Sequence, residues 1–345
     1  VNPEVLTPQA AFDFVLDDLN TAISSGQLHT SGPVATGDPL QFVLGEAAAR
    51  FIRAKVNLNS ASILGAAPAG AMDAVIADVD AIEALGFELD LVGPGEDYFD
   101  IWRPDSNSEV IYYMNTGTGN RVLNMIHPNQ SGWNGFVTLT ETYRLFGSDD
   151  VNDDARLGLA GPDFDGVSTG YLRGQQLDGD GNPLTDRQNA PLVYEDELLT
   201  SLEINNERTG IRVVKYPQRG PEGTPNGFTN SENVWLRLSE AYLMRAEAAL
   251  RGGSGGNADA DINALRNRAG ATPLGSVSLQ DVYDEYKREM NAEANIAGMR
   301  AVQVRFGTFA ETWELKNVQD DFRVLFPIPT TALASNPNLV QNPGY

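Results

Sequence analysis

The sequence predicts a mostly α-helical protein in which an irregular region separates two helical parts. Apolar residues recur at helical spacing over most of the first ninety residues, and again from residue 231 onward. Residues 93–230 are instead rich in Gly, Pro, Asn, Asp and aromatic side chains, with only short strand-like stretches. We therefore divide one domain, residues 1–345, into an N-terminal helical part (1–92), an irregular region (93–230) and a C-terminal part (231–345).

The first helix is expected to begin at Thr7, which can cap it, with Pro8 in its first turn. Three apolar stripes at helical spacing then predict packed helices. The first contains Phe12, Val15, Leu16, Leu19 and Ile23; the second contains Leu40, Val43, Leu44, Ala47, Phe51, Ala54 and Leu58; the third contains Met72, Val75, Ile76, Val79 and Ile82. On the third helix we expect Asp73, Asp78, Asp80 and Glu83 to face solvent.

Short β-hairpins are expected in the irregular region. The stretches "EVIYYMN" (109–115), "PLVYE" (191–195) and "GIRVVKY" (210–216) read as strands between turn-forming residues. Binding residues tend to lie on loops that a rigid scaffold positions. We therefore look for a ligand site in this region.

The C-terminal part is expected to begin with one long helix over "NVWLRLSEAYLMRAEAAL" (233–250), with Trp235 on its core face. The "GGSGG" run ends it, and Asn257 caps a second helix that Gly270 ends. This pair has about the length of a tetratricopeptide unit. Ser278 and Asp281 form a capping pair for a third helix.

Composition excludes several classes of function. A formal charge of −23 without basic patches argues against binding to nucleic acid. No run approaches the ~18–20 apolar residues of a membrane helix, and without Cys there is no disulfide or thiolate chemistry. The opening "VNPEVLTPQAAF" resembles neither a signal peptide nor a natural start, so we expect that targeting information has been removed.

No catalytic motif is convincing. The two histidines, His29 and His127, lie in separate loops, and zinc-protease, P-loop and dinucleotide signatures are missing. "GVSTG" (166–170) matches the pattern around a nucleophilic Ser168, but neither a strand before it nor a helix after it is indicated. A pair of carboxylates acting as a glycosidase remains an enzyme alternative, because sequence spacing does not reveal such a pair.

Aromatic residues in loops are the best candidates for binding, because sugar rings stack on Trp and Tyr. Trp133 in "HPNQSGWNGF" lies outside every helical stripe, so it either binds a ligand or holds its own loop in place. His127, Asn129, Gln130 and Asn134 surround it in sequence and can hydrogen-bond hydroxyl groups. Tyr98, Trp102 and Tyr171 are further candidates for the ligand site, although packing is the first interpretation of Trp102 and of Trp313.

The stretch "LDGDGNPLTD" (177–186) has a partial calcium-loop pattern in Asp178, Asp180, Asn182 and Asp186. A calcium loop of the EF-hand type needs Gly at its sixth position and Glu at its twelfth. Counting from Asp178, these positions hold Pro183 and Asn189. We therefore interpret the stretch as a turn with calcium as the alternative, and we expect no other cofactor or metal.

The C-terminal third resembles the SusD/RagB family in the order and spacing of several motifs. These are "NVWLRLSEAYLMRAEAALRGG", "ADINALRNRAGATPL", "LQDVYDEYKREMNAEANIAGMRAVQVRFGTF" and, most specifically, "LFPIP" and "NPNLVQNPGY". The resemblance extends weakly back to the N-terminal helices. Where the family commonly has "EGHR", this chain has "EANIAGMR" (293–300), which we expect to belong to the scaffold and not to the binding site.

The resemblance implies a right-handed superhelix of tetratricopeptide-like pairs with an inserted irregular region. It also implies a surface-exposed lipoprotein held at the outer membrane by an N-terminal lipid anchor. Such a protein is not an enzyme: it captures a glycan and delivers it to a SusC-like TonB-dependent transporter. A peptide ligand is the alternative within the family, and no binding residue can be transferred by motif.

Overall fold

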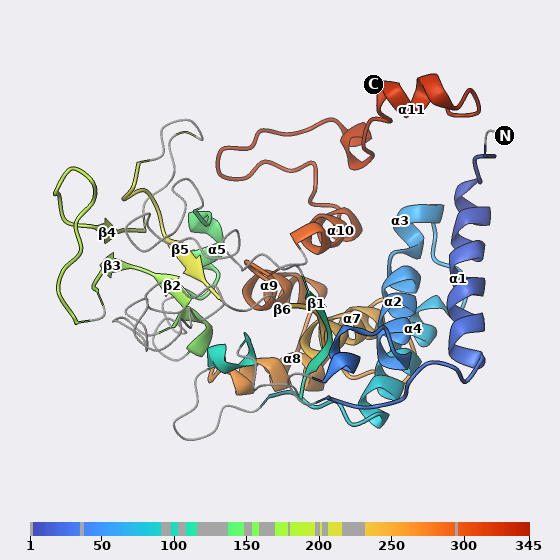
Figure 1. Cartoon of the computed structure of the whole chain (residues 1–345), viewed down its shortest axis with the longest axis horizontal. Helices are drawn as coiled ribbons and strands as arrows, with labels where there is room; N and C mark the ends of the chain where they lie inside the picture. The colour runs from blue at the N-terminus through green and yellow to red at the C-terminus, as the bar shows by residue number, and fades with distance from the viewer. Residues whose placement is uncertain are drawn as a thin grey trace.

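Helices gathered around α2 (Glu46–Leu58), α4 (Ala71–Ala84) and α7 (Leu238–Leu250) form one end of the molecule, and the strands β3 (Gly174–Gln175) and β4 (Val193–Tyr194) lie at the other (Figure 1). The prediction of a mostly α-helical protein is confirmed, and the middle of the chain contains only short strands. No helix in the described residues combines the length and the apolar character needed to cross a membrane. The computed structural model describes residues 3–34, 38–90, 98–102, 108–115, 137–147, 154–158, 170–178, 180–196, 201, 206–215, 232–293 and 296–345.

Helix α1 (Pro8–Ser24) begins as predicted. The Thr7 side chain accepts a hydrogen bond from the backbone N–H of Ala10 at 3.2 Å, and proline occupies the first turn. The helix packs on α2 and α3, but only Phe12 of its apolar stripe is fully buried. Phe14, which the stripe does not include, is 58% exposed.

Helix α2 is shorter than the apolar stripe that predicted it. Residues Pro39–Phe42 form a single 3-10 turn, η1, and the backbone is extended at Val43 and Gly45 before α2 (Glu46–Leu58) begins. Val43 and Leu44 are therefore 46% and 49% exposed, where the stripe predicted burial. The stripe was misleading here because a proline-started turn and an extended glycine interrupt the helix.

Helix α4 (Ala71–Ala84) follows α3 (Ser60–Leu64) and carries the third predicted stripe in its core face. The prediction that Asp78 faces solvent was wrong, because Asp78 is 1% exposed. Its carboxylate pairs with two arginines of α2, Arg53 at 2.5 Å and Arg50 at 3.3 Å. The ion pairs compensate the cost of burying a charge between two helices.

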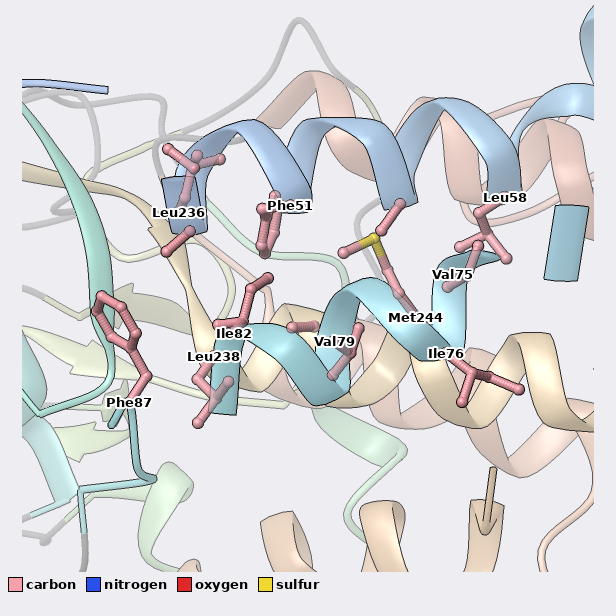
Figure 2. Close-up of a cluster of buried hydrophobic side chains, with 14 of the residues drawn as sticks. Phe51, Leu58, Val75, Ile76, Val79, Ile82, Phe87, Leu236, Leu238 and Met244 are labelled. Carbon is pink, nitrogen blue, oxygen red and sulfur yellow. The ribbon is translucent and has the colours of Figure 1, made fainter. Parts of the chain in front are cut away.

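The main hydrophobic core lies where α2, α4 and α7 meet (Figure 2). Phe51 of α2 and Ile82 of α4 are fully buried there, and Met244 of α7 packs against both helices. A second core joins α7 to α8 (Ala258–Arg268), α9 (Leu279–Glu289) and α10 (Ile296–Phe306). Its fully buried members are Leu243, Ala246, Ile262, Leu265 and Val282.

Side-chain caps mark the starts of two of the C-terminal helices. Asn257 accepts from the N–H of Ala260, and Ser278 and Asp281 form the predicted reciprocal capping box. The helices are α7 (Leu238–Leu250), α8 (Ala258–Arg268), α9 (Leu279–Glu289) and α10 (Ile296–Phe306).

The first of these helices starts later than predicted. Residues Glu232–Arg237 form strand β6, which pairs antiparallel with β1 (Val110–Asn115), so Trp235 lies on a strand and not on a helix. The same residues fit a helical stripe, but the backbone of β1 supplies hydrogen-bond partners from more than a hundred residues away. Tertiary pairing overrides local periodicity in this segment.

Two further strand pairs and three short helical elements lie in the described part of the irregular region. The stretches around "PLVYE" and "GIRVVKY" contain strands as predicted. Strand β2 (Gly170–Leu172) pairs with β5 (Arg212–Val214), and β3 (Gly174–Gln175) pairs with β4 (Val193–Tyr194). Other elements are η2 (Tyr98–Trp102), α5 (Thr140–Arg144) and η4 (Ala155–Leu157).

The two most specific C-terminal motifs are bound to each other. After η5 (Asp321–Val324), the Gln341 side chain accepts from the N–H of Ile328 at 2.8 Å and donates to its carbonyl at 3.0 Å. The Tyr345 hydroxyl donates to the Leu325 carbonyl at 2.8 Å. Side chains around α11 (Thr330–Ser335) reach the other terminus, since Asn336 and Asn338 both donate to the carbonyl of Pro3.

Candidate functional site

Trp235 is an exposed aromatic side chain at a break in a strand pair. Tyr112 and Tyr113 of β1 pair with Leu236 and Val234 of β6, so Trp235 between them has no partner on β1. An extra residue of this kind forms a β-bulge, which redirects the side chain that it carries. Trp235 is 36% exposed although Val234 and Leu236 on either side are buried.

The indole of Trp235 has no ring contact or hydrogen bond to the described residues. It therefore presents an apolar face and an N–H donor, which together can hold a sugar ring and one of its hydroxyl groups. The prediction that Trp235 is a core residue was wrong. Only the pairing of β6 with β1 reveals the bulge, so the sequence alone did not identify this residue as a candidate.

Tyr98 and Trp102, which the sequence suggested as ligand contacts, are 1% and 3% exposed. They pack with Phe99 in an aromatic cluster, where the Tyr98 and Trp102 rings lie 5.5 Å apart. The Tyr98 hydroxyl donates to Glu289 at 2.9 Å, and Lys215 lies 4.9 Å above the Trp102 ring. These side chains are engaged in packing, which leaves almost no surface for a ligand.

Tyr171 is also buried, at 3% exposure, in a cluster with Phe146 whose ring lies 5.2 Å away. Its hydroxyl accepts a hydrogen bond from Asn291 at 2.8 Å. The remaining predicted ligand contacts and the candidate nucleophile Ser168 lie outside the described residues. These ligand contacts are His127, Asn129, Gln130, Trp133 and Asn134.

A buried ion-pair cluster connects the irregular region to the C-terminal helices. Its members lie beside or on β1, η4, β5, β6, α8 and α9, and none is more than 6% exposed. The buried ion-pair cluster consists of Glu109, Asp154, Arg156, Lys215, Arg237, Arg268, Glu285, Glu289 and Glu293.

Arg237 is at the centre of this cluster. Its guanidinium contacts Glu109 at 2.9 Å, Glu289 at 2.8 Å and Glu293 at 2.6 Å. Arg268 also pairs with Glu109 and Glu289. The pairing gives every charge of the cluster at least one oppositely charged partner after it has been removed from water, which buried charges require.

The cluster lowers the pKa values of both Glu289 and Lys215, for different physical reasons. Burial alone would raise the pKa of Glu289, but Arg268, Arg237 and Arg156 hold it well below its usual value. Burial lowers the pKa of Lys215 to about 8, and the attraction of Glu293 only partly offsets this effect.

The carboxylates of the cluster are buried in the scaffold. Glu109, Glu285 and Glu289 are all 0% exposed, so a sugar cannot reach their carboxylates. Glu293, at the start of the "EANIAGMR" segment, pairs with Arg237 and Lys215, as expected of a scaffold residue. The cluster therefore provides no acid and nucleophile pair for glycoside hydrolysis.

The suspected calcium loop is a side-chain-capped turn. The Asp178 carboxylate accepts from the N–H groups of Asp180 at 3.0 Å and Asn182 at 2.8 Å, and these contacts lower its pKa. Asp186 instead accepts from the N–H groups of Gln188 and Ala190. No group of three or more acidic or histidine side chains with metal-binding spacing occurs in the described part of the chain.

Similarity to characterised proteins comes from both sequence and structure. The curated Starch-binding protein SusD of Bacteroides thetaiotaomicron is 34% identical over 149 residues, covering 39% of this chain. The chain thus spans only 26% of the length of that relative.

Solved structures at low identity share the fold over nearly the whole chain. A SusD-like protein from Bacteroides fragilis has a TM-score of 0.68 at 20% identity, covering 98% of this chain and 71% of its own. Surface glycan-binding protein A from Bacteroides thetaiotaomicron, in complex with laminarihexaose, has a TM-score of 0.60 at 16% identity, covering 98% and 72%. The model of the SusD family matches residues 99–297 and 280–345, which is more than half of the sequence, so the chain belongs to the SusD family.

Proposed function

We propose that this protein binds a glycan at the cell surface, without cleaving it, and delivers it to a SusC-like TonB-dependent transporter in the outer membrane. The observation that carries the proposal is the 34% identity to a starch-binding protein of the same family. A structural relative was solved with laminarihexaose, so α- and β-glucans are the first ligands to test.

Trp235 supports carbohydrate binding on physical grounds. Its indole is 36% exposed at a bulge, and no described side chain covers it by ring stacking. Exposed tryptophan faces suit the C–H face of a pyranose ring. Trp133, which belongs to the irregular region between β1 and β6, is proposed as a second platform on the sequence argument given above.

Binding without cleavage is proposed because the buried carboxylates described above form ion pairs and no catalytic motif in the sequence is convincing. The experiment that tests both parts begins with a glycan array on the purified protein. Titration calorimetry with maltohexaose and laminarihexaose then measures affinity, and a reducing-end assay over a day measures cleavage. Binding with no release of reducing ends is expected.

Other results would redirect the assignment. Steady release of reducing ends that depends on protein concentration would favour the glycosidase alternative. Failure to bind any arrayed glycan, together with binding to a peptide library, would favour the peptide-binding alternative within the family.

The transporter and the lipid anchor form the finer part of the proposal. We expect a full-length gene to encode a lipobox cysteine ahead of Val1. Affinity purification of the tagged full-length protein from outer membranes should recover a SusC-like transporter in comparable amount. Recovery of the protein alone from gently solubilised membranes would contradict the proposed partner.

A further inference from the structure

We propose that a hollow beside β4 is a glycan subsite that binds a neutral, polyhydroxylated stretch of the ligand; this inference rests on the proposed function. The hollow has a volume of about 370 Å³ and is lined by Pro191, Val193, Glu195, Asn206 and Arg208. Strand β4 lies at the end of the molecule opposite α1 (Figure 1). None of these lining residues belongs to the hydrophobic cores of the helical end or to the buried ion-pair cluster.

Arg208 is held in place by a residue that the sequence first suggested as a calcium ligand. Its Nε lies 3.2 Å from the Asp186 Oδ2, while Asp186 Oδ1 accepts backbone N–H groups from Gln188 at 2.8 Å and Ala190 at 2.9 Å. Asp186 is 6% exposed, whereas the Arg208 side chain is 44% exposed. The buried Asp186 carboxylate, which accepts two backbone hydrogen bonds, thus fixes the exposed Arg208 guanidinium at the edge of the hollow. This lowers the conformational entropy that the side chain loses when a ligand binds.

The other two polar side chains also present unused hydrogen-bonding groups. The Asn206 Oδ1 accepts from the backbone N–H of Arg208 at 2.7 Å, which fixes the amide and leaves its Nδ2 as a donor. Glu195 is exposed and forms no hydrogen bond or ion pair with the described residues. Its carboxylate therefore adds an acceptor to the guanidinium and amide donors.

This set of groups favours a neutral ligand over a charged one. An anionic sugar would be repelled by Glu195 and by the formal charge of −23, and the Arg208 guanidinium beside Glu195 opposes the attraction that this carboxylate exerts on a cationic ligand. Neighbouring hydroxyl groups of a neutral pyranose both donate and accept, so they can satisfy the carboxylate, the guanidinium and the amide together.

The volume of the hollow and its apolar lining residues agree with this assignment. Small-molecule sites have volumes of roughly 300–1,000 Å³, and a hollow at the lower end of this range suits a short stretch of a longer chain. Pro191 and Val193 supply an apolar surface for the C–H groups of a sugar ring.

The test measures the affinity of Glu195→Ala and Arg208→Gln for maltohexaose and laminarihexaose by titration calorimetry. Loss of one charge-assisted hydrogen bond should weaken binding of the better hexasaccharide by about tenfold in each variant. Glu4→Ala is the matched control, because Glu4 is exposed on the segment before α1, at the opposite end of the molecule. Melting temperatures show whether each variant is folded.

The outcomes separate this inference from the proposed function. Weaker binding by both hollow variants, with Glu4→Ala unchanged, supports the subsite. If wild type and all three variants bind equally well, the subsite is overturned and glycan capture still stands. If the wild-type protein binds no glycan on the array, the proposed function fails and the subsite fails with it.

Discussion

Arg237 on β6 donates a hydrogen bond from Nη1 to Oε1 of Glu289 on α9 at 2.8 Å, with both side chains essentially removed from solvent. The contact joins a strand pair of the irregular region to the C-terminal helices. A buried ion pair of this kind contributes little relative to an apolar pair of the same size, but loss of one partner is costly. The position of β6 against α9 therefore depends on keeping both charges.

We expect Arg237→Met to destabilise the protein by about 3–5 kcal/mol, because it leaves buried carboxylates without their main cation. Urea unfolding followed by circular dichroism measures the change. Arg323→Met is the control, since Arg323 is 48% exposed and lies 3.8 Å from Asp320, and it should cost less than about 1 kcal/mol. Equal costs for the two variants would show that the cluster does not hold β6 against α9.

The acid dependence of stability should follow from Glu289. Its pKa is depressed in the folded protein, so below about pH 4.5 the unfolded chain takes up a proton that the folded chain does not. The free energy of unfolding should therefore fall as the pH drops below this value. It should continue to fall until the pH passes the folded-state pKa.

Glu289→Gln should lower stability at pH 7 and also flatten this acid dependence. One proton corresponds to a slope of at most about 1.4 kcal/mol per pH unit. Between about pH 4.5 and 3, the slope measured for the variant should be smaller than the wild-type slope by up to this amount. Glu4→Gln, at an exposed position, should keep the wild-type slope. An unchanged slope in Glu289→Gln would show that other carboxylates cause the acid sensitivity.

Local signals in the sequence were sufficient for the helix starts at Thr7 and Ser278, because the cap and its partner lie within three residues of each other. Non-local pairing was not visible in the same way. Trp235 fits a helical stripe, and only the backbone of β1 places it on a strand. Asp78 has a polar side chain at a position expected to face solvent, but two arginines on α2 bury it.

The candidate binding residues were the least predictable feature. Glu195 and Arg208 lie thirteen positions apart in sequence, with no motif between them, and Asp186 holds Arg208 only because the strands fold back. The burial of Tyr98, Trp102 and Tyr171 excludes them as ligand platforms. The sequence did not reveal this, because aromatic residues occur both in cores and at binding surfaces. Composition cannot distinguish these two uses.

The turn at Asp178 should be independent of calcium. Its carboxylate is already satisfied by the backbone N–H groups of Asp180 and Asn182. We expect EDTA to change the melting temperature by less than about 2 °C, whereas an ion at a hundredfold excess over its dissociation constant would add ~2.7 kcal/mol. A larger shift that excess Ca²⁺ but not Mg²⁺ reverses would establish a calcium site in place of the turn.

The pairing of the two C-terminal motifs should be sensitive to Gln341. Its side chain forms two hydrogen bonds with the backbone of Ile328, each worth about 1 kcal/mol. Gln341→Ala should therefore speed amide hydrogen exchange at residue 328 several-fold without affecting α7. Gln280→Ala, an exposed side chain on α9 that contacts Asp284, should leave exchange at residue 328 unchanged.

Trp235 and Trp133 should each contribute to glycan affinity as stacking platforms. Replacing either by alanine should weaken binding about tenfold, because stacking is worth roughly 1–2 kcal/mol and 1.4 kcal/mol corresponds to one decade. Phe14→Ala is the control: this aromatic side chain is 58% exposed on α1, at the end of the molecule opposite β4. The glycan affinity of Phe14→Ala should match that of the wild type.

Calorimetry and thermal melting on the same samples distinguish a platform from a packing residue. A platform loses affinity while the melting temperature stays within about 2 °C, because an exposed side chain contributes little to stability. If Trp235→Ala instead melts many degrees lower and its folded fraction binds normally, the indole stabilises the β1–β6 bulge. The same pattern in Trp133→Ala would identify that side chain as the one that holds its loop in place. Ligand stacking would then depend on the tryptophan whose replacement lowers the affinity and leaves the melting temperature unchanged.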